Sequence, residues 1–375
     1  MDRDRRRLLQ LVGTAGIIGA TGCVGDEVSD VVDDEEDDTE STGEDDVPED
    51  DDFSEDVNDQ ETNDGKSNDE DEEVPELPEN GVVAFVYHDG PIHDYTEAFP
   101  AHEAYDAPAT TCVVTDWIGT SRGVADRLDV EHLEELHDAG WEIGSHTTDH
   151  ATLGEFELLT EVGEDDHRIY PEEHRHGHHP GKEVEITDGS TSVLRTIEGF
   201  GDDEDEERYV ELTEAVGESF PAGDTVVRYP EDEIHNMLAD SKEALETLGF
   251  EAYSFLAPYD NFGEYAMEFV PDYYECVANA SLERPRINYL DIFDPYELRH
   301  RYFIEFTTPE DVKRDLDEIA TTGALGVFGA HAFKEEVTED AIRETLQWIE
   351  DRDIEVMTLR DAVELYDPHA AHVNE

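Results

Sequence analysis

The chain has 375 residues, of which 102 are acidic and 24 are Lys or Arg, giving a formal net charge of −78. Such a chain repels nucleic acid and anionic lipid headgroups, so neither is an expected partner. The acidity is not confined to a tail, because the part from Gly81 onward still carries about 71 acidic residues against about 19 Lys and Arg. At molar salt the Debye length falls to about 3 Å, which removes most of the self-repulsion of so acidic a domain. The composition therefore predicts a protein adapted to high salt.

The first 23 residues have the pattern of an export signal. Paired arginines at Arg5 and Arg6 precede an apolar run through Ala20, which is too short to span a bilayer. The arginines resemble a twin-arginine signal, and the small residues before Cys23 resemble a lipobox in which that cysteine is lipidated. We therefore expect a lipoprotein on the outer face of the cytoplasmic membrane, held there by its lipid alone. The expected source is a halophilic archaeon. A plain N-terminal anchor is the alternative.

Residues 24–80 form an acidic Asp/Glu/Ser/Asn stretch, which predicts a disordered, extended tether. The remainder, 81–375, has the apolar periodicity of a folded domain. Of the three cysteines, Cys112 and Cys276 lie on predicted strands, where small buried side chains without a disulfide are expected.

Strands and helices alternate along the folded part. The predicted strands are 81–87, a run that ends at 112–114, and then 141–145, 252–256, 324–328 and 354–357. The predicted helices are 130–139 after Asp129 as N-cap, 231–248 before Gly249, 311–320, one capped by Thr338, and one from about Leu359. This order predicts a mostly parallel sheet covered by helices, and seven or eight such units suggest a closed barrel.

The segment 153–228 does not fit the alternation and is interpreted as an insertion on the catalytic face. It contains four histidines within six residues, His174, His176, His178 and His179. They could form a second metal site or a lid over the substrate entrance. A solvated loop with coincidental histidines is the favoured interpretation.

Polar side chains follow four of the predicted strands, at one rim of the barrel. His146 and His150 come after the third strand with i, i+4 spacing, which on one turn places both imidazoles on the same side. Asp89, after the first strand, would supply a carboxylate to the same ion. Two histidines and one carboxylate are a common open site for zinc and also for iron(II). The other strand ends carry Pro258-Tyr259 and His331.

From about Val82 to Asp367 the sequence resembles the polysaccharide deacetylases with the NodB homology domain, also called carbohydrate esterase family 4. The first family motif, Thr-Phe-Asp-Asp-Gly, corresponds to residues 86–90, and the His-Ser/Thr-x-x-His motif is matched in full by residues 146–150. The Pro-Tyr motif corresponds to Pro258-Tyr259, and the closing Leu-x-His element to residues 329–331.

The resemblance implies a distorted (β/α)7 barrel, here with an insertion. It implies that the protein removes acetyl groups from N-acetylated or O-acetylated polysaccharide. It also implies a divalent metal, Zn²⁺ first, with Co²⁺, Ni²⁺ or Fe²⁺ as alternatives, held by Asp89, His146 and His150. The Tyr259 backbone N–H would stabilise the oxyanion, and His331 would protonate the leaving amine. Substrate contacts are expected from Pro258, Tyr259 and Trp117, because aromatic rings stack on sugars.

The sequence departs from the family at two positions. The catalytic base of the family is the first aspartate of motif one, which here is His88. A neutral imidazole can accept a proton near pH 7, although a nearby cation weakens it as a base. Asp94 or Asp116 could substitute for it. The arginine expected before Pro258 is missing, and Arg299 or Arg301 could fill that space. The alternative function is therefore a carbohydrate-binding member of the same fold that has lost catalysis.

Overall fold

The computed structural model describes residues 76–123, 125–203, 207–282 and 284–373. The predicted signal, Cys23 and nearly all of the acidic tether lie outside the described residues. Within the described part, no helix is both long enough and apolar enough to cross a membrane.

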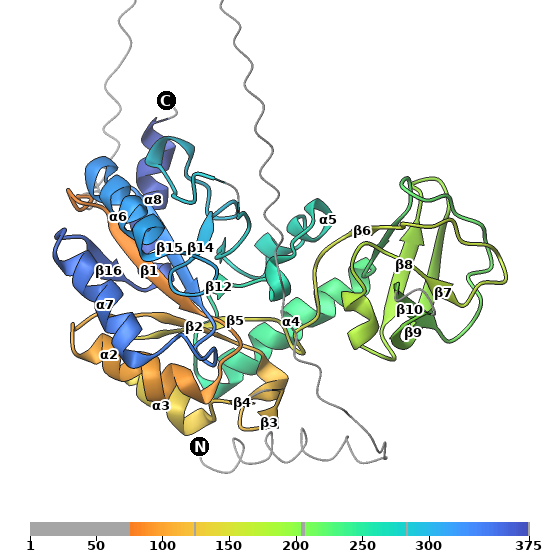
Figure 1. Cartoon of the computed structure of the whole chain (residues 1–375), viewed down its shortest axis with the longest axis horizontal. Helices are drawn as coiled ribbons and strands as arrows, with labels where there is room; N and C mark the ends of the chain where they lie inside the picture. The colour runs from red at the N-terminus through yellow and green to blue at the C-terminus, as the bar shows by residue number, and fades with distance from the viewer. Residues whose placement is uncertain (1–75, 124, 204–206, 283, 374–375) are drawn as a thin grey trace, which may run out of the picture. The chain divides into compact units, whose positions relative to one another are not determined.

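A curved sheet of parallel strands forms the centre of the fold (Figure 1). Its strands are β1 (Val82–Tyr87), β2 (Thr110–Val113), β5 (Glu142–Ser145), β12 (Ser254–Phe255), β13 (Cys276–Val277), β14 (His300–Tyr302), β15 (Leu325–Ala330) and β16 (Glu355–Met357). Seven of them follow the order β13-β12-β5-β2-β1-β15-β14, and β16 pairs with β1 beside this path. A parallel bridge between Ser281 and Arg299 links the chain after β13 to the chain before β14. The predicted distorted (β/α)7 barrel is confirmed.

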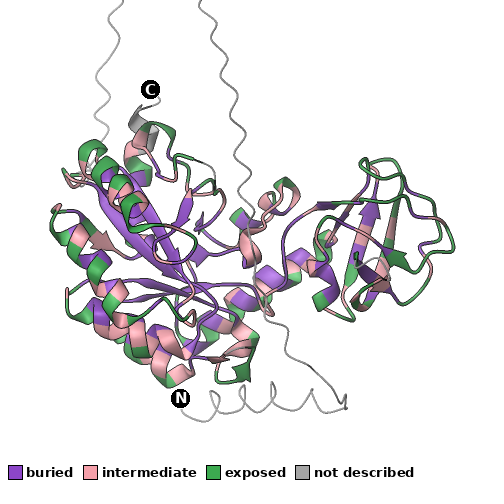
Figure 2. Cartoon of the chain, viewed as in Figure 1, coloured by how far each residue is buried: buried purple, intermediate pink, exposed green. Residues whose placement is uncertain are grey.

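The strand β1 lies at the middle of the sheet, and its side chains are completely buried. Because helices cover one face of a parallel barrel and side chains fill its interior, such a strand needs apolar residues on both faces. This is why the run Val-Val-Ala-Phe-Val-Tyr shows no alternation. Figure 2 shows the same burial along the neighbouring strands. Cys112 and Cys276 lie on β2 and β13 as buried free thiols, which confirms that they do not pair with each other.

Helices surround the sheet and begin where the sequence places their caps. They are α2 (Phe99–Glu103), α3 (Val130–Asp138), α4 (Glu231–Leu248), α5 (Glu264–Met267), α6 (Pro309–Thr322), α7 (Glu339–Glu350) and α8 (Leu359–Val373). The Asp129 side chain accepts a hydrogen bond from the His132 N–H, and Thr308 and Thr338 cap α6 and α7 in the same way. Gly249 ends α4 with a left-handed φ of 101°. These helices confirm the predicted ones to within about two residues.

Short elements fill the connections. They are β3 (Ser121–Arg122), β4 (Ala125–Asp126), η1 (Asp94–Ala98), η2 (Thr115–Trp117), η4 (Pro258–Asp260), η5 (Val270–Asp272) and η6 (Leu290–Ile292).

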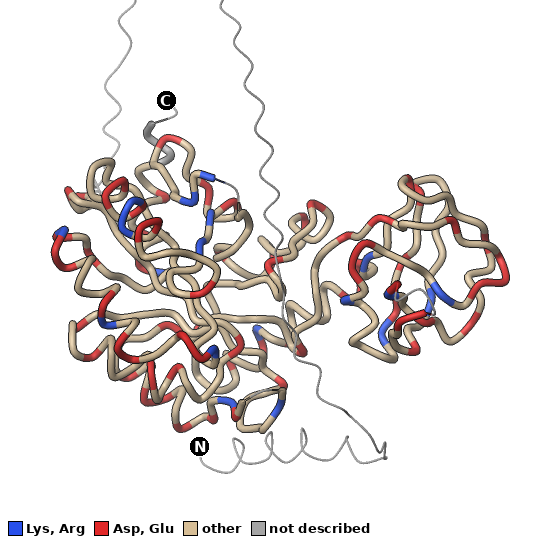
Figure 3. The backbone as a smooth tube through the Cα atoms, in the orientation of Figure 1, with Lys and Arg blue, Asp and Glu red and all other residues tan. Residues whose placement is uncertain are grey.

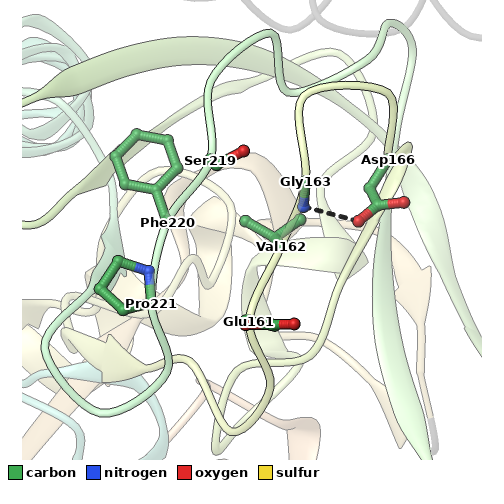
Figure 4. Close-up of a pocket in the computed structure, with 7 residues that line it drawn as sticks. All are labelled: Glu161, Val162, Gly163, Asp166, Ser219, Phe220 and Pro221. Atoms are coloured by element: carbon green, nitrogen blue, oxygen red, sulfur yellow. Dashed lines mark hydrogen bonds between the residues drawn. The ribbon is translucent and has the colours of Figure 1, made fainter.

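The segment 153–228 contains a second, antiparallel sheet. It has the order β6-β11-β8-β9-β10-β7, with β6 (Phe156–Glu157), β7 (Arg168–Ile169), β8 (Glu183–Thr187), β9 (Ser192–Asp202), β10 (Arg208–Leu212) and β11 (Val226–Arg228). A hollow of about 440 Å³ lies within it, between residues 161–166 and 219–221 (Figure 4). None of the predicted site residues lines this hollow, so it carries no part of the predicted chemistry.

The His-rich turn belongs to this second sheet and forms the short helix η3 (Arg175–His178). The favoured interpretation, a solvated loop, is wrong for two of its histidines, since His176 is 0% exposed and His174 is 9% exposed. The His176 ring packs against Tyr229 and Phe156, at centroid distances of 4.7 and 5.3 Å. Its burial lowers its pKa to about 3, so this histidine is neutral at physiological pH.

Candidate functional site

Asp89, His146 and His150 converge at the carboxyl ends of β1 and β5. The Asp89 Oδ1 atom lies 3.2 Å from His146 Nε2 and 3.1 Å from His150 Nε2. The donor atoms of all three side chains lie within 4.8 Å of one another. The structure therefore brings together the three residues that the sequence predicts as metal ligands.

The protonation of these side chains suits a cation. His146 Nδ1 lies 2.7 Å from the Leu256 carbonyl and donates to it, which leaves the Nε2 lone pair directed at Asp89. Burial lowers the pKa of His150 to about 4, so its imidazole is neutral near pH 7. Burial would raise the pKa of Asp89, but His150 and His146 outweigh it and hold this pKa well below its usual value.

The Asp89 Oδ1 atom is buried and makes no hydrogen bond to any described residue. A buried ionised carboxylate oxygen without a hydrogen bond is unfavourable unless a positive charge lies beside it. A divalent ion with nitrogen and oxygen ligands supplies that charge. The three residues therefore fit a divalent cation.

The backbone around the ligands is strained. Asp89 and His150 have left-handed φ angles of 71° and 65°, which are uncommon for residues other than glycine. Each such residue costs on the order of 1–3 kcal/mol and persists only where its surroundings hold it. Arg127 Nη1 donates to the Asp89 carbonyl at 3.2 Å and lies 3.8 Å from its Oδ2. Arg127 was not predicted from the sequence.

His88, at the position of the family's base, lies in a group of imidazoles. Its Nε2 is 3.3 Å from His300 Nε2, and its ring centroid is 4.5 Å from that of His331. His88 is 2% exposed and His300 is completely buried. Burial, and then the neighbouring His331 and His300, lower the pKa of His88 well below its usual value. Gly329 makes the close pair possible, because a Cβ there would overlap the His300 ring.

His331 has the opposite environment. Its Nδ1 lies 2.5 Å from Glu305 Oε1, and the same oxygen accepts the His331 backbone N–H at 3.0 Å. Burial alone would lower the pKa of His331, but the hydrogen bond and charge of Glu305 outweigh it and raise this pKa. The arrangement favours a protonated His331 with Nε2 available to a ligand. Glu305 was not predicted from the sequence.

Tyr259 lies on η4 with a left-handed φ of 63°. Its ring centroid is 4.5 Å from that of His150, and Trp117 stacks on the same imidazole at 5.1 Å. Pro258, the first residue of this turn, is buried. Asn279 Nδ2 donates to the Ala257 carbonyl at 2.9 Å, which fixes the chain immediately before Pro258. Tyr259 and Trp117 thus both border the three converging ligands.

Four residues were proposed as substitutes for the missing base and arginine, and the structure gives each a different environment. Asp94 is completely buried and accepts the Thr111 hydroxyl at 2.6 Å, while Asp116 is exposed. The Arg299 guanidinium donates to the Pro285 carbonyl at 2.9 Å. Arg301 forms an ion pair with Asp315. Asp94, Arg299 and Arg301 are thus engaged by partners of their own, and His88 stays a candidate base.

Comparison with known proteins gives one family match. Residues 77–176 match the family model "Polysaccharide deacetylase". No protein in the curated set matched the sequence.

Solved structures give matches of low similarity. A family 4 acetyl xylan esterase from Clostridium thermocellum in complex with cobalt is 13% identical, with 76% of this chain and 91% of that chain covered and a TM-score of 0.38. The peptidoglycan deacetylase PdaC from Bacillus subtilis is 13% identical, with 78% and 95% covered and a TM-score of 0.38. A family 4 carbohydrate esterase from Bacillus anthracis is 11% identical, with 76% and 84% covered and a TM-score of 0.38.

Proposed function

We propose that this chain, of which residues 77–176 match the polysaccharide deacetylase family model, is a metal-dependent hydrolase of acetylated polysaccharide. Its substrates are N-acetylated or O-acetylated glycans outside the cell. The observation that carries the proposal is the convergence of the Asp89, His146 and His150 donor atoms around a buried carboxylate oxygen without a hydrogen bond. Zn²⁺ is the first candidate for the ion, and Co²⁺, Ni²⁺ and Fe²⁺ also suit two imidazoles and a carboxylate.

Asp89, His146 and His150 would hold a divalent ion, which when bound would lower the pKa of a water toward about 7 and polarise the acetyl carbonyl. The chain supplies the remaining functions. The Tyr259 backbone N–H donates to the developing oxyanion, and its strained φ fixes the direction of that donor. His331, held protonated by Glu305, gives its Nε2 proton to the leaving amine. Trp117 and the Tyr259 ring border the site as surfaces on which a sugar can pack.

A second function is supported by the environment of His88. A base works best when its pKa lies near the working pH, whereas burial and neighbouring imidazoles lower the pKa of His88. A member with so weak a base could still bind the metal and the glycan. The second candidate is therefore a carbohydrate-binding protein with impaired catalysis.

The proposed location and salt requirement follow from the sequence. Lipidated Cys23 would hold the domain at the outer face of the cytoplasmic membrane through the acidic tether, where a polysaccharide substrate is accessible. Asp and Glu far outnumber Lys and Arg along the described chain (Figure 3). Their repulsion is screened at molar salt. Unfolding when the salt is diluted would support this adaptation, and an unchanged unfolding temperature would contradict it.

Acetate release tests the proposed function. The full-length protein, in molar KCl, is incubated with N-acetylated chito-oligosaccharide and with acetylated xylan, before and after treatment with a chelator. Release that stops with the chelator and returns when Zn²⁺ or Co²⁺ is added supports the deacetylase. Release that persists in an Asp89→Asn variant contradicts it. Metal and oligosaccharide binding without acetate supports the impaired binding protein.

A further inference from the structure

We propose that the inserted segment positions the metal centre: Lys182 and His179 hold the metal-binding loop through Asp149, and Arg175 holds Tyr259. The inference rests on the metal site of the proposed function. It gives the second sheet a role in metal binding. Neither the family match nor the three proposed ligands Asp89, His146 and His150 assign it such a role.

The first contact is with the loop of residues 146–150. Lys182 Nζ lies 3.2 Å from Asp149 Oδ2, and His179 Nδ1 lies 3.5 Å from the same oxygen. Asp149 directly precedes His150, whose φ is left-handed. The side chains of Lys182, Asp149 and His179 are 21%, 22% and 11% exposed. Partly buried pairs are screened less by salt than exposed ones, so this contact persists under the conditions the composition predicts.

The second contact is with the Pro-Tyr turn. The Arg175 guanidinium lies 4.3 Å from the centroid of the Tyr259 ring, and the His150 ring lies 4.5 Å from the same ring between centroids. Glu173 Oε2 accepts the Arg175 Nε–H at 3.0 Å and so orients the guanidinium. A strained bulky residue such as Tyr259 keeps its conformation only where contacts over-determine it. Arg175 supplies one such contact from outside the barrel.

The two contacts come from one stretch whose ends are fixed. Arg175 lies on η3, and Lys182 directly precedes β8, the strand that continues into the second sheet. Glu155 and Glu185 both bind Arg228, at 2.9 and 2.8 Å, which ties the entry of the segment to β11 and β8. A loop that is carried on rigid elements holds its contacts within a narrow range of geometry. The segment therefore acts on His150 from two sides, through Asp149 and through Tyr259.

Metal affinity tests this role without requiring turnover. Co²⁺ and Zn²⁺ dissociation constants are measured for the full-length protein by competition with a chelator in molar KCl. Substituting a residue that hydrogen-bonds a metal ligand typically lowers metal affinity about 10–100-fold. Lys182 contacts Asp149 and not a ligand side chain, so Lys182→Met is expected to weaken metal affinity less, roughly threefold to tenfold. Lys182→Arg keeps the charge and is expected to restore most of the affinity.

Matched controls separate positioning from general destabilisation. Lys242→Met removes a partly buried lysine of α4 that pairs with Glu246 and donates to the Ala252 carbonyl, and its metal affinity should equal that of the wild type. Arg175→Gln is compared with Arg168→Gln, which removes a similar contact with Tyr209, 4.2 Å away, inside the second sheet. Arg175→Gln should weaken metal binding and change the visible spectrum of bound Co²⁺, while Arg168→Gln should do neither.

The outcomes distinguish this proposal from the proposed function. Wild-type affinity in both Lys182→Met and Arg175→Gln overturns the positioning role, whether or not acetate is released. If Lys182→Met does not fold, Asp149→Asn removes the same ion pair with little change of shape, and its affinity decides in the same way. A wild-type protein that binds metal but releases no acetate contradicts the deacetylase and leaves the affinity comparison valid.

Discussion

Replacing Glu305 by Gln tests whether His331 is kept protonated as the general acid. The Glu305 side chain is completely buried, and its Oε1 lies 2.5 Å from His331 Nδ1. A hydrogen bond to a charged group contributes about 1.5–3 kcal/mol, and one between neutral groups about 0.5–1.5 kcal/mol. Gln keeps the acceptor but loses the charge, so the protonated imidazole loses roughly 1.25 kcal/mol, the difference between the midpoints of these two ranges. Since one pKa unit corresponds to about 1.36 kcal/mol, the pKa of His331 should fall by about one unit.

The sign of the effect on activity follows from the role of the proton. Glu305 raises the pKa of His331, so the protonated acid persists to higher pH in the wild type. In Glu305→Gln the high-pH side of the kcat profile should therefore move about one pH unit lower. The assay is acetate release across pH in molar KCl, with NMR titration of His331 in parallel. Glu335→Gln, the same charge change at an exposed residue, is the control. A high-pH side that does not move, or an unchanged His331 titration, refutes the assignment.

Three further substitutions test the rest of the site. Asp89→Asn removes the carboxylate that faces both imidazoles, and it should weaken Zn²⁺ binding at least about 100-fold in equilibrium dialysis, more than an outer-shell change does. His88→Asp restores a carboxylate at the base position and should raise the rate of acetate release roughly 100-fold, the smallest acceleration that is typical of general-base catalysis. An unchanged rate means that the base does not limit turnover. Gly329→Ala should lower the free energy of unfolding by about 1–3 kcal/mol, because its Cβ overlaps the His300 ring; denaturant unfolding that matches the wild type contradicts this packing.

The sequence predicted the parts of the molecule that depend on local pattern. β1 was found because a strand buried on both faces is a continuous apolar run, and α4 because Gly249 ends it. The convergence of the three proposed metal ligands was predicted for a related reason. His146 and His150 are four residues apart on one turn, and Asp89 follows the first strand, so the barrel topology alone brings them to one rim.

The residues that were missed depend on contacts between distant segments. His300 lies on the three-residue strand β14, which has no apolar run or spacing that indicates a partner, yet its ring meets His88, 212 residues earlier. Glu305 approaches His331 from a loop, as one of 102 acidic residues. The buried His176 was missed because four neighbouring histidines resemble a polar loop until the second sheet packs around them.

Three imidazoles at the rim of the barrel receive different roles from their neighbours. His146 directs Nδ1 at a carbonyl, which leaves Nε2 as a ligand. His331 binds a buried carboxylate, which raises its pKa and suits it to the proposed role of general acid. Burial and then the surrounding imidazoles lower the pKa of His88, which makes it a poor candidate for a strong base. When the environments of two titratable groups shift their pKa values in opposite directions, one group is suited to act as an acid and the other as a base. His88→Asp is therefore a sharper test than any loss of function, since only a base-limited deacetylase gains rate from it.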